Sequence, residues 1–167
     1  MENQERRLFG PPIPISGGAD SRGEEARRFR LAPIQEMNLD DTVETEAYIR
    51  FINDPLNSPH FTDPPTTVET LRNFCSNDTV HPLVARNELG EIVGGAIIID
   101  AEPYQHDHTI RLVVIDPRMQ NRGLGKQMLN QVIDWAFTTP ASDGRERKKL
   151  DVNFIEDVDL LNQNEIT

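Results

Sequence analysis

The stretch TIRLVVIDPRMQNRGLGKQMLNQVIDWAF, residues 109–137, decides the fold. Its first part is rich in β-branched and apolar residues and ends at a proline, which predicts a buried strand over 108–116. Apolar residues then recur at helical spacing, which predicts an amphipathic helix over about 122–137. The loop between them carries the pattern Q-x-x-G-x-G at 120–125. A strand, a glycine-containing loop and a helix therefore follow one another directly.

This loop has the properties of an anion-binding site. Its two glycines let a ligand approach the backbone, and the free N–H groups at the start of a helix point at negative charge. Arg118, Arg122 and Lys126 against Asp116 give a local net charge of 3 − 1 = +2 within a chain of net charge −11. The expected ligand is a phosphate group. The alternative is a plain strand-to-helix turn in which the glycines only relieve steric clashes.

Two other phosphate-binding loops do not fit this stretch. A P-loop needs a glycine where Gln120 stands, and a serine or threonine where Gln127 stands. The dinucleotide-binding loop of Rossmann domains needs a glycine at the position of Met128. The sequence thus excludes both of these nucleotide-binding classes.

The rest of the chain supplies the other layers of an α/β domain. Capping signals predict helices that begin at Asp41 and Thr66. Period-two patterning predicts strands over 27–35, 80–86, 91–101 and 150–155. Asn87–Gly90 has the composition of a hairpin turn, and Gly94-Gly95 predicts a bulge or a close backbone approach. The predicted order is β-α-α-β-β-β-α-β.

The loop and its neighbours resemble the GNAT acyltransferase superfamily. The acyl-CoA loop of that family has the form Q/R-x-x-G-x-G/A and follows a strand that ends in an apolar-x-Pro pattern, as Ile115-Asp116-Pro117 does. The element order from Arg27 to Ile155 also agrees. The resemblance implies an α/β (α+β) fold with a mixed, mostly antiparallel sheet flanked by helices. It further implies an N-acetyltransferase that uses acetyl-CoA, a primary amine as acceptor, and no metal.

The resemblance also assigns cofactor-binding residues. In such enzymes the strand before the loop pairs with the pantetheine arm through its main chain, a role that falls on Val113, Val114 and Ile115. The pyrophosphate is expected on the N–H groups of Gln120, Asn121, Arg122, Gly123, Leu124, Gly125 and Lys126. The side chains of Arg118, Arg122 and Lys126 are expected to add charge-assisted contacts.

The general base is less evident. Many relatives carry a glutamate eleven residues before the loop's first residue, where this chain has Thr109, which is no base at neutral pH. Asp107 lies on the same strand face as Thr109 and is a candidate that acts through a water; His108 or His106 is a candidate in another register. The alternative for these three residues is a solvated turn. A zinc site at His106-x-His108 lacks further nearby ligands.

The C-terminal part of the family pattern is missing. Relatives continue into a helix with an asparagine and a tyrosine that acts as general acid, whereas the tyrosines here, Tyr48 and Tyr104, precede the loop. Asn162 is a candidate for the asparagine. The expectation is therefore a shortened domain whose last strand self-associates, for instance in a homodimer. The alternative function is a non-catalytic acyl-CoA-binding or subunit-interaction module.

Composition supports one acidic domain. The 167 residues carry 17 basic and 28 acidic side chains, which argues against nucleic acid or a membrane as partner. A single cysteine and no apolar run of spanning length favour a cytoplasmic protein. Residues 1–26 are rich in proline and glycine and predict a flexible tail before a domain over 27–167. Cys75 and Trp135 are expected in the core, and 145–149 is expected to be a solvated loop.

Overall fold

The computed structural model describes residues 17–101 and 108–152. The helices are α1 (Gly17–Arg28), α2 (Thr42–Asn53), α3 (Val68–Phe74) and α4 (Leu124–Thr138), with the 3-10 turns η1 (Ser58–His60) and η2 (Pro117–Met119). The strands are β2 (Gln35–Glu36), β3 (Val80–Arg86), β4 (Ile92–Ile99), β5 (His108–Ile115) and β6 (Leu150–Val152). From β2 onward the order is the predicted β-α-α-β-β-β-α-β. None of the helices in the described ranges has the length and apolar character needed to cross a membrane.

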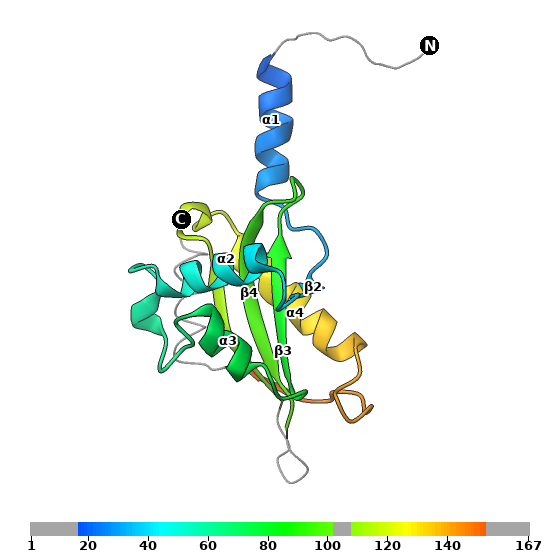
Figure 1. The fold of residues 1–167 in the computed structure, drawn as a ribbon. Coiled ribbons are helices and arrows are strands. Elements are labelled where there is room, and N and C mark those ends of the chain that lie inside the picture. The colour runs from blue at the N-terminus through cyan, green and yellow to red at the C-terminus, as the bar shows by residue number, and fades with distance from the viewer. Residues whose placement is uncertain (1–16, 102–107, 153–167) are drawn as a thin grey trace.

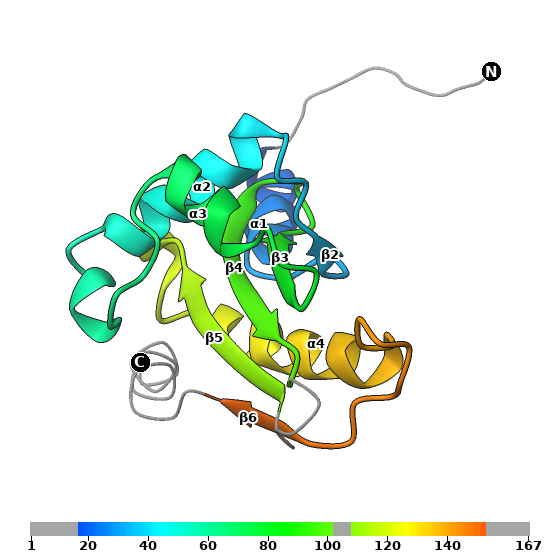
Figure 2. The ribbon, with the colours of Figure 1, turned by 60° about the horizontal axis from the view of Figure 1, so that its bottom comes forward.

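The five strands form one sheet in the order β2-β3-β4-β5-β6. Neighbouring strands are antiparallel except β5 and β6, which are parallel, so the expected mixed and mostly antiparallel sheet is confirmed. Helices α2 and α3 cover one face and α4 covers the other (Figure 1, Figure 2). Each face has its own apolar core: one packs beneath α4, and the other packs beneath α2 and α3.

The N-terminal region differs from the expectation. Part of the predicted tail is helical, because α1 begins at Gly17 and stands away from the sheet (Figure 1). The strand expected over 27–35 is reduced to β2, which lies after Pro33. The physical reason is that the α4 side chains bond this backbone: Gln127 accepts from Leu31 N–H at 2.9 Å, and Gln131 accepts from Ile34 N–H at 2.6 Å. Protease sensitivity of residues 1–26 stays a prediction.

The helix starts are close to those predicted. Asp41 caps α2 by accepting from the N–H of Val43 at 2.8 Å. The capping box of α3 is shifted by one residue, since Thr67 is the N-cap and Thr70 is its reciprocal partner. Helix α4 begins at Leu124, two residues later than expected, because Gly123 has a φ of 84° and so cannot belong to a right-handed helix.

Candidate functional site

A bulge in β5 sets the geometry of the candidate site. Gly95 is paired with Val114, and Ile97 is paired with Arg111, so two steps along β4 face three steps along β5. The extra residue distorts the strand at Leu112, whose φ of 56° lies in the left-handed region. A bulge turns main-chain groups out of the regular ladder, which makes them available to other partners.

The glycine pair in β4 and a tyrosine from α2 hold the bulge. A Cβ on Gly94 would collide with the carbonyl oxygen of Val114, and a Cβ on Gly95 would lie 2.6 Å from the Tyr48 ring. The fully buried Tyr48 donates its hydroxyl hydrogen to the carbonyl oxygen of Leu112 at 2.7 Å. The predicted bulge and the predicted close approach both occur at this place.

The outer edge of β5 is paired over only part of its length. Parallel pairing with β6 joins His108, Thr109 and Ile110 to Leu150, Asp151 and Val152. Within the described ranges, no strand pairs with this edge beyond Ile110. The unpaired part includes Val113, Val114 and Ile115, whose side chains are fully buried in the two cores. The segment expected to pair with pantetheine is thus a strand edge fixed by its own packing.

Two side-chain amides bond the main chain at the Ile115 end of this edge. Gln120, expected to contribute its N–H to the phosphate site, turns its side chain inward, where Nε2 donates to Asn57 Oδ1 at 2.8 Å and to the carbonyl oxygen of Ile115 at 3.3 Å. The fully buried Asn57 donates to the carbonyl oxygens of Phe51 at 2.8 Å and Ile115 at 3.2 Å. Sequence reasoning missed Asn57, because an asparagine in a proline-rich loop has no distinguishing local pattern.

The loop after β5 presents backbone donors at its outer side. Asn121 has a φ of 66° and Gly123 a φ of 84°, both in the left-handed region. Among the described residues, no side chain caps the N-terminus of α4, where the first N–H groups of a helix have no intrahelical acceptor. A Cβ placed on Gly123 would meet no atom within 4 Å, so the space beside this glycine is open. The geometry has room for an anion against the backbone.

The three cations of the loop are not equivalent. Arg118, although its side chain is 81% exposed, bonds the nearly buried carboxylate of Asp116 at 2.7 Å. Arg122 is exposed and stacks on Phe29, with 4.7 Å between the guanidinium carbon and the ring centroid. Lys126 is exposed in the first turn of α4. The charge of Arg118 is therefore largely balanced, and Arg122 is held by a residue that sequence reasoning did not connect to the loop.

Only one of the candidates for the base, His108, lies within the described residues. Asp107 and His106 lie outside the described residues. His108 follows the alternation of Ile110 and lies on the α4 side, whereas Thr109 lies on the side of α2 and α3. His108 Nδ1 is 3.2 Å from Asp100 Oδ1 and 3.2 Å from the Ala101 amide nitrogen. These contacts hold the His108 side chain against Asp100, where it is largely buried and not solvated.

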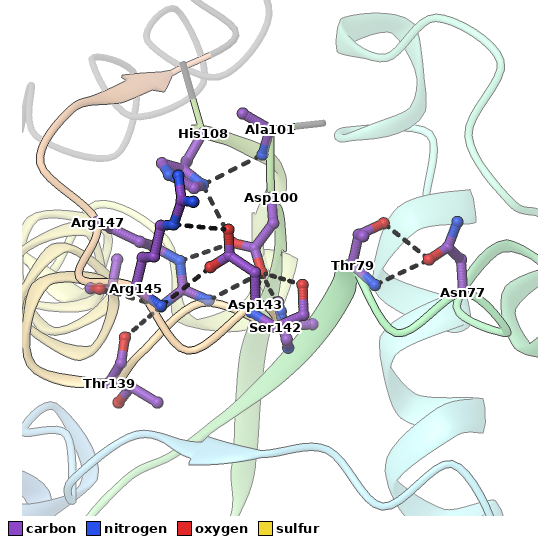
Figure 3. A network of polar contacts seen from close by, with 12 residues as sticks. Asn77, Thr79, Asp100, Ala101, His108, Thr139, Ser142, Asp143, Arg145 and Arg147 are labelled. Atoms are coloured by element: carbon purple, nitrogen blue, oxygen red, sulfur yellow. Dashed lines mark hydrogen bonds and ion pairs between the residues drawn. The ribbon is translucent and has the colours of Figure 1, made fainter. Parts of the chain in front are cut away.

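Asp100 is the centre of a buried polar network at this end of β5 (Figure 3). Its carboxylate accepts from Arg147 Nε at 2.7 Å and from the N–H of Ser142 at 2.9 Å, and it lies 2.6 Å from His81 Nε2. Arg147 is only 2% exposed and also donates to the carbonyl oxygen of Ala136 at 3.0 Å. The expectation of a wholly solvated 145–149 loop is thus wrong for Arg147, because a buried carboxylate of distant sequence number attracts it.

Opposing effects act on the pKa of Asp100. Burial by itself would raise it, but hydrogen bonds from Arg147, Ser142 and His81, together with the Arg147 charge, hold it well below the usual range. The carboxylate is therefore ionised at neutral pH, and its oxygens are hydrogen-bonded within the protein.

Burial raises the pKa of the Cys75 thiol to about 11, which agrees with the expected core position. No group of three or more metal-ligating residues occurs in the described part of the chain.

Comparison with known proteins adds a family and a fold. The family model described as acetyltransferase (GNAT) family matches residues 46–146, which is more than half of the chain. No curated protein sequence matches the chain.

Several solved structures are similar in fold. The spermidine N-acetyltransferase from Vibrio cholerae, in complex with CoA and spermine, has a TM-score of 0.54 and 16% identity over 66% of this chain and 65% of that chain. A dodecameric structure of the same enzyme has a TM-score of 0.50, with 15% identity over 66% of this chain and 64% of that one. A transcriptional regulator from Bacillus halodurans has a TM-score of 0.50, with 20% identity over 74% and 81% of the two chains. The chain thus spans less than two thirds of the spermidine acetyltransferases it resembles.

Proposed function

The chain belongs to the acetyltransferase (GNAT) family, and from this premise we propose that it transfers an acetyl group from acetyl-CoA to a primary amine. The single observation that carries the proposal is that, within the described residues, the uncapped N-terminus of α4 follows an edge of β5 that no strand covers beyond Ile110. These two features offer one ligand an anion site and a main-chain pairing edge. CoA has a pyrophosphate for the first and amide groups in its pantetheine arm for the second.

The proposed placement follows the chain direction. The pyrophosphate lies on the N–H groups of residues 120–126, with Arg122 and Lys126 nearby, and the pantetheine arm returns along Val113–Ile115. An arm that starts at the loop and follows this edge backwards for about 10 Å reaches the bulge at Leu112. The thioester is then beside the face of the sheet that α2 and α3 cover.

The proposed reaction needs one proton transfer. The amine nitrogen attacks the thioester carbonyl carbon, a C–N bond forms, the C–S bond breaks, and the amine proton ends on the CoA thiol. Because Thr109 cannot accept a proton at neutral pH, we propose that Asp107 acts through a water. His108 is not proposed, since it lies on the other face of the sheet and contacts Asp100.

Calorimetric titration with acetyl-CoA tests the proposed cofactor site. We expect Gly123→Asp to abolish binding, because it places a carboxylate where the pyrophosphate lies. Gly144→Asp is the matched control: Gly144 has a φ of 86° and open space around it, as Gly123 does, but it lies in a turn after α4. The proposed placement of the pyrophosphate is contradicted if both variants lose the same acetyl-CoA affinity or if neither variant loses any.

The second candidate function is a module that binds acyl-CoA without catalysis. The observation that favours it is that Thr109 stands at the position of the usual glutamate. A thiol-release assay over a panel of amines separates the two functions. Acetyl-CoA binding without thiol release on any amine supports the module, and release with a defined amine supports the transferase.

We also propose that the protein self-associates. In the described part of the chain β6 is an outer strand of the sheet, and no strand pairs with its outer edge. A strand edge of this kind is a template for pairing with a second chain. Light scattering that gives the mass of a dimer or larger assembly supports this, and a monomer that melts cooperatively contradicts it.

A further inference from the structure

An arginine on the proposed acceptor side of the sheet lacks the partners that a buried arginine needs. Arg111 is partly buried, and its Nε is completely shielded from solvent yet has no hydrogen-bond partner. Nη2 makes one long contact, 3.4 Å, to the carbonyl oxygen of Thr62. Among the described residues, no carboxylate forms an ion pair with this guanidinium. Most of its donors therefore have no acceptor in the part of the chain that the structure describes.

The shielded Arg111 donor without an acceptor lowers the stability of the folded protein unless a ligand accepts a hydrogen bond from the guanidinium. A guanidinium has five N–H donors in a fixed planar arrangement, and a shielded donor without an acceptor destabilises the folded protein. Arg147 illustrates the ordinary solution in the same fold, because its Nε donates to the buried Asp100 at 2.7 Å. Within residues 17–101 and 108–152, Arg111 has no such carboxylate, so its donors are available to a ligand.

The location of Arg111 points to the acceptor rather than to CoA. The bulge places Arg111 and Leu112 consecutively on the face covered by α2 and α3, two residues after Thr109. The phosphate loop lies beyond the opposite end of β5, after Ile115. The contact with Thr62 puts the guanidinium beside the segment that joins α2 to α3. The acceptor amine has to approach the thioester at the bulge, where Arg111 lies.

We propose that Arg111 binds a carboxylate of the acceptor, so that the substrates are amines that also carry a carboxylate, such as amino acids. The planar guanidinium matches the two oxygens of a carboxylate, and burial strengthens that contact. A polyamine would instead bring a second positive charge to this arginine. The inference rests on the proposed transferase function and names its substrate class.

The test compares amines in pairs that differ by one carboxylate: phenylalanine with phenethylamine, and lysine with cadaverine. We expect the wild-type protein to prefer the carboxylated member by about 10- to 100-fold in kcat/KM. Arg111→Gln should remove this preference by raising KM for the carboxylated member, and should leave acetyl-CoA affinity unchanged. Arg145→Gln, which removes the same charge from an exposed arginine, is the matched control and should keep the preference.

Folding is checked with Arg111→Met, which keeps the length of the side chain without its donors. Because it removes an unpaired buried N–H, this variant should melt no lower than wild type while it loses the carboxylate preference. Three results would each overturn the inference. The first is that the wild-type protein prefers the amines without a carboxylate, and the second is that the carboxylate preference survives Arg111→Gln. The third is that Arg111→Gln weakens acetyl-CoA binding as much as it raises KM for the carboxylated amine.

A binding measurement keeps the inference testable if acetyl transfer itself is not found. If acetyl-CoA binds but no amine is acetylated, the transferase proposal fails on its own. The Arg111 Nε–H resonance, assigned with Arg111→Lys, is then titrated with phenylalanine and with phenethylamine in the presence of CoA. A shift with phenylalanine alone supports a carboxylate site at Arg111, and no shift with either compound overturns it.

Discussion

Polar groups at the two ends of β5 differ in how far the protein itself satisfies their hydrogen bonds. At the His108 end, Asp100 and Arg147 are buried and each makes several short hydrogen bonds within the protein. At the Ile115 end, the first turn of α4 has no capping side chain, and Arg122 is exposed. One strand thus connects a polar network that is complete without a ligand to a loop whose donors have no capping partner within the described residues.

This difference separates residues that hold the fold from residues proposed to bind. A buried charge that is fully bonded stabilises one arrangement of the chain and has no donor to spare. Donors left without a partner at a loop with open space are suited to an anionic ligand. Substitutions at the His108 end are expected to change stability, and substitutions at the Ile115 end are expected to change affinity for acetyl-CoA.

The largest expected effect is the loss of Arg147. Arg147→Met leaves the buried carboxylate of Asp100 without its charged partner and should lower the free energy of unfolding by about 3–5 kcal/mol. Arg145→Met, at an arginine whose side chain is 87% exposed, should change it by less than about 1 kcal/mol. Urea unfolding measures both variants. If both variants lose similar amounts of unfolding free energy, the buried pair of Asp100 and Arg147 stabilises the protein no more than an exposed arginine does.

Acid should weaken the same network. The pKa of Asp100 is lower in the folded protein than in the unfolded chain, where it is about 3.9. The Asp100 carboxylate therefore stabilises the folded protein above this unfolded pKa, and the stabilisation is lost as the pH falls toward the folded pKa. The difference in unfolding free energy between wild type and Asp100→Asn should therefore shrink below about pH 4. A difference that stays constant from neutral pH to the acid limit would contradict the lowered pKa.

At the other end, Arg122→Ala should weaken acetyl-CoA binding by about 1–3 kcal/mol, the value of a hydrogen bond to a charged group, without a comparable loss of stability. Arg118→Ala should cost less than about 1 kcal/mol of affinity, because Asp116 already balances that charge. Calorimetry measures the affinities and thermal melting measures the stabilities. Equal effects of the two substitutions would show that pairing with Asp116 is irrelevant to the site.

A smaller effect is expected at Phe29. Phe29→Leu keeps an apolar side chain but removes the ring on which Arg122 stacks, so acetyl-CoA affinity should fall by about 0.5–1 kcal/mol. In the background of Arg122→Ala the same substitution should have no further effect. Additive losses would mean that Phe29 acts on the site by another route.

The smallest effect is expected from the N-terminal tail. Limited proteolysis should cut within residues 1–26 early, because the described side chains of α1 before Arg28 are exposed. The remaining core retains Phe29 and the loop, so its acetyl-CoA affinity should equal that of the whole chain. A tail that resists protease would contradict this prediction.

Local patterns in the sequence were enough for the architecture and for the position of the loop. Strand β3 has the predicted bounds of 80–86, and Asp41 caps α2 as its D-x-x-E signal indicated. The paired glycines in β4 predicted a bulge or a close backbone approach, and the close approach needs them because only a residue without Cβ tolerates backbone or ring atoms at these distances. These features depend on residues that are near one another in the chain.

Contacts between distant residues were decided only in the folded protein. Asp100 and Arg147 are 47 residues apart, and the sequence around Arg147 resembles an ordinary charged loop. Phe29 with Arg122, and Asn57 with Gln120, likewise come from separate elements. The sequence by itself determined the order of strands and helices and the position of the loop between β5 and α4, because helix and strand periodicity, caps and turn residues act over a few positions. The tertiary structure alone decided which charges are paired within the described residues, because that depends on which side chains the packed sheet brings within hydrogen-bonding distance.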